Sequence, residues 1–219
     1  MNELGSAFAA FQKARGVGHR LPQCEAVILG SLSGGLMGRY AEEVIKARWP
    51  EAERLLWRHG QIHELIQYCE YAHKERWPRV EKEILRNGHA IDIIAYSLNV
   101  VGGRWPEAER KLLGERVGHW LISYAKQVIN GRWPEAEAII VETLFEEQYA
   151  KEVLPGNWGE QVAQKCPCWL YYYAKDVIGG MLPEELHNRM LAEGVRNPSD
   201  SWVTKYLGCK KYRRPRKPR

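Results

Sequence analysis

The sequence predicts an all-α protein, an α-solenoid of stacked two-helix repeats of about 28 residues each. Trp-Pro pairs recur at a constant step of 28 residues, at Trp49, Trp77, Trp105 and Trp133. A Tyr stands nine residues before each of these Trp, at Tyr40, Tyr68, Tyr96 and Tyr124. Apolar residues follow helical spacing around both markers. Two markers that keep step over four units predict a repeated structural unit.

The first helix of each unit is expected to begin at the Pro of the Trp-Pro pair. Proline lacks a backbone N–H and has a fixed φ, so it suits the first turn of a helix and breaks its interior. The residues three and seven positions after each Trp are apolar and lie four apart, which puts them on one helix face. They are Ala52, Val80, Ala108 and Ala136, and then Leu56, Ile84, Leu112 and Ile140.

The second helix is expected around the Tyr. Apolar residues precede the Tyr by three and two positions and follow it by four, which is again a helical stripe. The preceding residues are Leu65, Ile93 and Leu121 with Ile66, Ile94 and Ile122, and the following ones are Val44, Ala72, Val100, Val128, Val153 and Val177. Gly103, Gly131 and Gly180 then stand where a helix end favours a left-handed residue, and Gly60 and Gly88 do so after the first helix.

Weaker copies extend the repeat in both directions. A degenerate start lies at Leu21, and two later units lead from Tyr149 to Trp158-Gly159 and from Tyr173 to Leu182-Pro183. We therefore expect six clear units after the degenerate start, in a repeat domain of residues 1–200, and a basic tail of residues 201–219. A partial last copy from Trp202 to Tyr212 is an open alternative. Helix pairs this short cannot bury an apolar face alone, so neighbouring pairs must stack.

The composition favours a folded body with a separate basic end. Apolar residues make up 45% and charged residues 27% of the chain, which argues against a largely disordered protein. The formal net charge is +5, but the last ten residues hold seven positive charges and no negative one, which leaves a net charge of −2 for the rest. Because no long apolar run and no secretory leader occur, we expect no membrane span, reduced thiols and a cytoplasmic location.

The string Tyr-Ala-x-x-Val-Ile-x-Gly-Arg-Trp-Pro-Glu-Ala-Glu is clearest from Tyr124 to Glu137, and it resembles short repeats found in many proteins of tailed bacteriophages. The resemblance covers about residues 20 to 190. It implies a phage-encoded accessory protein in the cytoplasm of a bacterial host, and no particular activity. Departures at Leu21, Gly159 and Leu182 lie toward the ends, where repeat arrays carry atypical caps.

The repeated Arg, Trp and Tyr positions allow two interpretations. A row of Arg and Trp could stack on the bases of a nucleic acid, one unit per nucleotide, and a row of Tyr could line a ligand channel. In the alternative, Trp fills the joint, Arg pairs with a Glu of the following helix, and Tyr packs with its hydroxyl at the rim. The uniformity of the motif favours packing, because positions that read different bases should differ between units.

No catalytic, cofactor or metal site is expected. Cys166 and Cys168 have a single residue between them and no second pair nearby, which does not suit zinc. His59 and His63 are expected at the surface, on different helix faces. The run from Gly30 to Gly35 lacks the Lys-Ser/Thr of a phosphate-binding loop, so a helix–helix linker is the expectation. The sequence therefore predicts a protein that is not an enzyme.

The basic tail is the segment whose chemistry points most directly to a partner. Its cations are Lys210, Lys211, Arg213, Arg214, Arg216, Lys217 and Arg219. Its Pro residues disfavour a helix, so we expect an extended arm that neutralises phosphates or contacts an acidic partner, or else only a solubilising tail. The sequence predicts a helical-repeat binding or scaffold protein with a protein partner. The alternative is a nucleic-acid-associated protein that uses the tail.

Overall fold

The computed structural model describes residues 3–73, 75–154 and 165–209. All regular structure in these ranges is helical, with no β-strand, which confirms the predicted all-α class. By their internal contacts the residues divide into two compact units, Met1–Leu112 and Leu113–Arg219. The border falls within helix α8 (Pro106–Glu115). The stacking of the whole chain into a solenoid stays a prediction.

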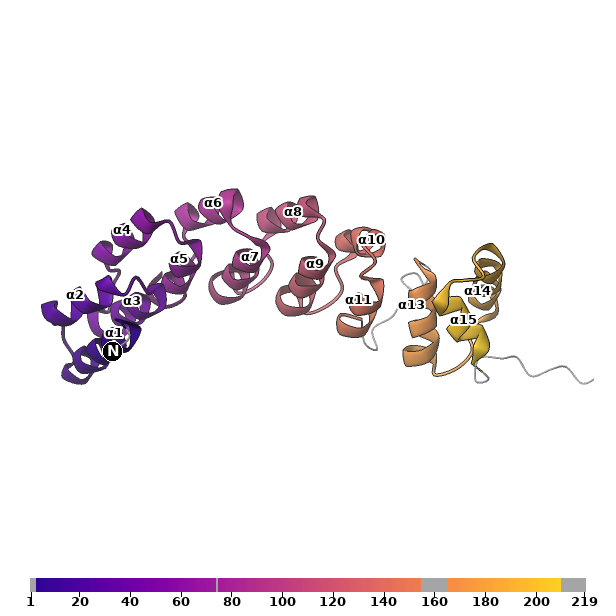
Figure 1. The fold of residues 1–219 in the computed structure, drawn as a ribbon, viewed down its shortest axis with the longest axis horizontal. Helices are drawn as coiled ribbons and strands as arrows, with labels where there is room; N and C mark the ends of the chain where they lie inside the picture. Colours follow the sequence, from indigo (N-terminus) through magenta and orange to yellow (C-terminus); the bar gives the residue numbers. More distant parts are fainter. Residues whose placement is uncertain (1–2, 74, 155–164, 210–219) are drawn as a thin grey trace, which may run out of the picture. The chain divides into compact units, whose positions relative to one another are not determined.

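Unit 1 contains a leading helix, three helix pairs and most of α8. Its helices are α1 (Glu3–Val17), α2 (Pro22–Gly30), α3 (Gly34–Tyr40), α4 (Pro50–His59), α5 (Ile62–Tyr68), α6 (Pro78–Asn87) and α7 (Ala90–Tyr96). In Figure 1, α2, α4 and α6 follow one edge of this unit, and α3, α5 and α7 form a second row. Neighbouring second helices contact one another, and α1, which lies outside the repeat, packs on α2 and α3.

Unit 2 contains further first and second helices. Its helices are α9 (Gly118–Tyr124), α10 (Pro134–Glu142), α11 (Glu146–Glu152), α13 (Pro167–Tyr172), α14 (Glu184–Arg196) and α15 (Ser201–Gly208). A buried apolar cluster joins the last three helices through Leu170, Leu186, Met190, Val203 and Tyr206. Residues 201–208, which the sequence assigns to the tail, therefore form a helix that packs on α13 and α14.

The predicted helix starts are confirmed. Helices α2, α4, α6, α8 and α10 begin at Pro22, Pro50, Pro78, Pro106 and Pro134. In the last predicted unit the start shifts by one residue: Pro183 is the N-cap, and α14 begins at Glu184. All eight residues predicted on the inner face of the first helices are buried, each with at most 2% of its surface exposed. These helices therefore place one face on the core, as their periodicity indicates.

The second helices change from α to π geometry at or just after the Tyr, which the sequence did not predict. The π segments are η1 (Ala41–Ile45), η2 (Cys69–His73), η3 (Ser97–Val101), η4 (Ala125–Ile129) and η5 (Tyr173–Ile178). Four of them end on a left-handed residue, which is Lys46, Gly102, Asn130 or Gly179. The next N–H then bonds to the carbonyl six residues earlier. This wide turn closes the helix and directs the chain toward the next Trp or Leu.

Four of the five glycines predicted to be left-handed are not. Gly103, Gly131 and Gly180 do not have a positive φ, because the left-handed residue lies one position earlier at the end of the π turn. Gly60 is left-handed as predicted, with a φ of 65°, but Gly88 has a φ of −72°. A Cβ at Gly88 would lie 2.7 Å from the carbonyl oxygen of the residue four positions earlier, so close approach favours glycine there.

The apolar stripe four residues after the Tyr is only partly buried. Val44 and Val153 are buried, Ala72, Val100 and Val128 are half-buried, and Val177 is exposed. The α-helical spacing that predicts this stripe does not hold in a π turn, which contains more residues per turn and rotates later side chains off the inner face.

The Gly-rich run does more than link two helices. Helix α2 ends at Gly30 and α3 begins at Gly34, so the linker is shorter than predicted. The N–H of Gly34 donates to the carboxylate of Glu64 at 2.6 Å. A Cβ at Gly34 would lie 1.8 Å from the carbonyl oxygen of Glu64. Glycine at this position therefore lets α3 approach α5 at backbone distance.

Candidate functional site

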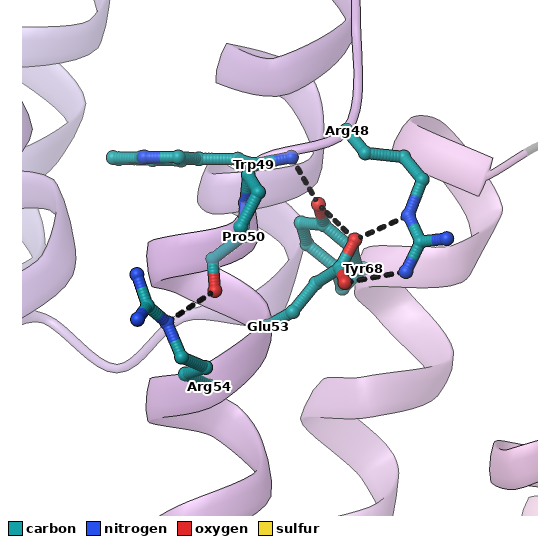
Figure 2. Close-up of polar contacts among 6 residues, drawn as sticks. All are labelled: Arg48, Trp49, Pro50, Glu53, Arg54 and Tyr68. Atoms are coloured by element: carbon teal, nitrogen blue, oxygen red, sulfur yellow. Dashed lines mark hydrogen bonds and ion pairs between the residues drawn. The ribbon is translucent and has the colours of Figure 1, made fainter.

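A cluster of Arg, Trp, Glu and Tyr recurs at the start of the first helices, and we call it the junction (Figure 2). The N–H of Trp49 donates to the hydroxyl of Tyr68 at 2.9 Å. That hydroxyl donates to Glu53 Oε1 at 3.2 Å. Arg48 donates to both carboxylate oxygens of Glu53, at 2.8 and 2.5 Å. Tyr68, the last residue of α5, thereby holds the N-terminus of α4.

The junction recurs with constant spacing in unit 1. The Tyr lies 19 residues after the donor N–H at Leu21–Tyr40 (3.2 Å), Trp49–Tyr68 (2.9 Å) and Trp77–Tyr96 (2.8 Å). The Arg pairs with the Glu five residues later at Arg20–Glu25, Arg48–Glu53, Arg76–Glu81 and Arg104–Glu109. The degenerate start at Leu21 therefore builds the same junction without a Trp.

Each Tyr also contacts the following Trp through its ring. The ring centroids lie 4.9 Å apart for Tyr40 and Trp49, 6.4 Å for Tyr68 and Trp77, and 5.2 Å for Tyr124 and Trp133. The four Trp are at most 9% exposed, and the four Tyr are fully buried. With buried rings and guanidinium groups bound to Glu, the geometry favours packing over base stacking. The Tyr hydroxyls lie inside the junction, so the prediction that they lie at the rim is wrong.

Burial and hydrogen bonding set the protonation states of the junction. Burial raises the pKa of Tyr40 to about 12 and also raises the pKa of Tyr68 and Tyr96 above the usual 10. The hydrogen bonds from Arg20 hold the pKa of Glu25 below its usual 4.5. At neutral pH the Tyr40 hydroxyl is therefore a neutral donor and the Glu25 carboxylate a charged acceptor, which strengthens the bond between them.

The described residues of unit 2 contain two variants of the junction. Trp133 donates to Tyr149 at 2.7 Å although only 16 residues separate them, and Glu137 pairs with both Arg132 and Lys165. Burial alone would raise the pKa of Glu137, but the two cations outweigh it and hold that pKa below 4.5. Within the described residues the ring of Tyr149 stacks on Trp169, at 5.6 Å. The predicted partners Trp158 and Gly159 lie outside the described residues.

The last junction replaces three of its four side chains. The N–H of Leu182, in place of a Trp, donates to the hydroxyl of Tyr206 at 3.2 Å. Nδ1 of His187 lies 2.8 Å from the same hydroxyl, where the other junctions have a Glu. Tyr173, the predicted Tyr of this region, is only half-buried. The Tyr that completes the junction therefore comes from α15, in the region left open as a partial last copy.

The Cys and His candidates show no ligand geometry. Cys166 and Cys168 are buried at the start of α13, and the hydrogen bond that the Cys168 thiol donates to Cys166, together with burial, raises the pKa of Cys168. His59 and His63 are exposed and belong to α4 and α5. Over the ranges that the structure describes, no three His, Cys, Asp or Glu residues gather as metal ligands. No described helix has the length and apolar character needed to cross a bilayer.

A pocket of about 540 Å³ lies in unit 1 outside the junctions, and no motif in the sequence predicted it. Leu4 and Phe8 of α1 form one wall and are 53% and 47% exposed. Arg39, Glu70 and Tyr71 lie on its other side, and Arg39 donates to the Tyr71 hydroxyl at 3.2 Å. The only sequence signal was the pair of large apolar residues at i and i+4 before the repeat begins.

The tail cations Lys210, Lys211, Arg213, Arg214, Arg216, Lys217 and Arg219 lie outside the described residues. The structure therefore brings together the junction residues and leaves the tail prediction untested. No family model, no curated protein and no solved structure matches this chain.

Proposed function

We propose that this chain is a non-catalytic helical-repeat binding protein, and that the pocket lined by α1, α3, α5 and η2 receives an apolar side chain of a protein partner. The observation that carries the proposal is the half-exposure of Leu4 and Phe8 in a pocket of about 540 Å³. A soluble surface rarely leaves two neighbouring large apolar side chains open in a concave site unless they are covered on binding.

The chemistry of the pocket suits an anchor side chain with polar contacts around it. Leu4, Phe8 and Leu36 supply an apolar wall. Arg39 stacks on Tyr71, with its guanidinium carbon 4.9 Å from the ring centroid, and Glu70 adds a carboxylate. An apolar centre with an aromatic and Arg at its edge is typical of sites that dominate protein–protein affinity.

The repeat supports a scaffold role for the rest of the chain. The polar side chains of the junctions bond to one another and to the backbone, so their geometry supports packing rather than reaction chemistry. On the resemblance of the repeat, we further propose that the protein is phage-encoded and acts in the cytoplasm of a bacterial host.

Photocrosslinking tests the proposed surface. A photoreactive side chain at Leu4 should capture a partner that the same group at Val195, an 83% exposed residue of α14, does not capture. After purification, the captured partner should bind the Phe8→Ser chain about tenfold more weakly than the parent chain, because a buried anchor loses its apolar wall. Val195→Ser is the matched control. Identical captures at both positions, or unchanged affinity of Phe8→Ser, would contradict the proposal.

The second candidate function is nucleic-acid association through the tail, which its seven cations in ten residues favour. Replacing those seven residues with Ala in the full chain should abolish binding to single-stranded RNA or DNA and remove its salt dependence. Unchanged binding would rule out this function for the tail.

A further inference from the structure

A second pocket of unit 1 lies where the repeat departs from its own pattern. The residue after the Trp-Pro pair is Glu in three of the four units, at Glu51, Glu107 and Glu135, but it is Arg79 in the unit of Trp77. The residue seven positions after the Pro is apolar and aliphatic in three units, at Leu85, Leu113 and Val141, but it is Trp57 in the unit of Trp49. A repeat scaffold requires neither change, since the other units fold without them.

These two exceptional residues meet in space. The guanidinium carbon of Arg79 lies 4.1 Å from the ring centroid of Trp57, and Trp57 contacts Trp77 edge-on, with ring centroids 5.9 Å apart. Both line a pocket of about 470 Å³ with Lys82, Glu83 and Arg86 of α6. Two departures from a regular motif that converge on one pocket indicate a site that is specific to this part of the chain.

The pocket is rich in donors and poor in acceptors. Arg79, Lys82 and Arg86 are exposed and have no ion-pair partner among the described residues. The single carboxylate that lines the pocket, on Glu83, accepts a hydrogen bond from Asn87 at 2.6 Å. The indole N–H of Trp57 is buried and has no acceptor within the described chain. The indole N–H groups of Trp49 and Trp133 share this property, but those rings are enclosed in junctions.

We propose that this pocket binds a phosphate group. A phosphate supplies several acceptor oxygens and negative charge, which match two guanidinium groups and an ammonium. A carboxylate has fewer oxygens and would leave more of these donors unbound. The Arg79 ring contact holds its guanidinium in place, so less side-chain entropy is lost when the anion binds. The phosphate is that of a free phosphate ester or of a nucleic-acid backbone, since both present the same oxygens.

The indole N–H of Trp57 offers a local readout in the full-length chain. In ¹H–¹⁵N spectra, its signal is assigned by its loss in Trp57→Phe, and it is followed during titration with inorganic phosphate and with a short single-stranded oligodeoxynucleotide. Saturable movement of this signal is expected. Movement with both probes assigns a free phosphate group, whereas movement with the oligonucleotide alone assigns a backbone phosphodiester. No movement with either probe, or equal movement with chloride at matched ionic strength, would overturn the proposal.

Three substitutions separate binding from folding. Arg79→Glu restores the residue of the other units and should weaken binding about tenfold or more, because it replaces a cation by an anion. Lys82→Ala provides a second, milder loss at an exposed position. Arg110→Ala is the control, since Arg110 holds the same repeat position as Lys82 but pairs with Glu107 and does not line the pocket. Equal affinity of Arg79→Glu, Lys82→Ala and the parent chain would overturn the site.

Discussion

In unit 1 the hydroxyl of Tyr68 accepts a hydrogen bond from the N–H of Trp49 and donates one to Glu53. In unit 2 the hydroxyl of Tyr206 accepts the N–H of Leu182 and lies against His187. The Trp, the Glu and the Arg have all changed between the two junctions, and the bond from the backbone N–H to the Tyr hydroxyl has not. The comparison indicates that this bond is the fixed requirement, and that the second polar partner of the hydroxyl can vary.

The partner of the Tyr hydroxyl differs in kind between the two junctions. Glu53 presents a carboxylate that also binds Arg48, whereas His187 presents one ring nitrogen, Nδ1, 2.8 Å from the Tyr206 hydroxyl. A single ring nitrogen therefore takes the place of a carboxylate that binds an Arg.

Removing an aromatic ring should have the largest effect. Trp49→Ala should lower the free energy of unfolding by about 3–5 kcal/mol, because it leaves a cavity against Tyr40. Leu182→Ala, at the same place in the last junction, should cost less, about 2–3 kcal/mol, because the removed side chain is smaller. Urea unfolding followed by circular dichroism gives both values. Equal losses would show that the Trp ring adds nothing beyond what Leu182 provides.

Removing the Tyr hydroxyl tests the shared bond directly. Tyr68→Phe and Tyr206→Phe should each cost about 2 kcal/mol, since each leaves a buried N–H without its acceptor. Hydrogen exchange should show faster exchange of the Trp49 and Leu182 amides in the respective variants. If Tyr206→Phe costs almost nothing while Tyr68→Phe costs the full amount, the carboxylate and not the backbone bond is the requirement.

The smallest effect concerns pH. The pKa of Glu137 is held below its usual 4.5 in the folded chain, so the unfolded chain binds a proton more readily. The stabilisation by Glu137 is therefore complete above pH 4.5 and is lost as the pH falls through the lower folded-state pKa. Urea unfolding between pH 6 and pH 3 should show this loss, and Glu137→Gln should reduce it. If Glu137→Gln loses as much free energy of unfolding between pH 6 and pH 3 as the parent chain, the role assigned to Glu137 is wrong.

Local rules in the sequence predicted much of the fold. Proline chemistry located the starts of α4, α6, α8 and α10, and helical periodicity identified the inner face of each first helix. These features depend on residues close together in the chain. The π turns did not follow from the sequence, because the same apolar spacing fits an α-helix until the tertiary contacts of the Tyr are known. For the same reason, the left-handed residue was predicted one position too late, at Gly103 and Gly131, whereas the structure has it at Gly102 and Asn130.

The candidate sites were harder to predict because they join distant residues. The sequence showed that each Tyr precedes a Trp by nine residues. It did not show that the hydroxyl of Tyr68 bonds to the N–H of Trp49, which lies 19 residues earlier. Leu4 and Phe8 lie before the repeat, so the periodicity gave no partner for them. Arg79 and Trp57 were not among the departures noted in the sequence, and their contact at 4.1 Å in the structure shows that they belong together.

In unit 1 the separation from the donor N–H to the Tyr hydroxyl is always 19 residues, which defines where whole repeats can be removed. Excising residues 50–77 would join Trp49 directly to Pro78 and leave Tyr96 19 residues beyond Trp49, so every partner of the missing junction would reappear in register. Excising one residue more or fewer would put a different side chain opposite the amide. Loss or gain of whole 28-residue repeats would therefore change the length of the protein while each junction keeps its bonding partners.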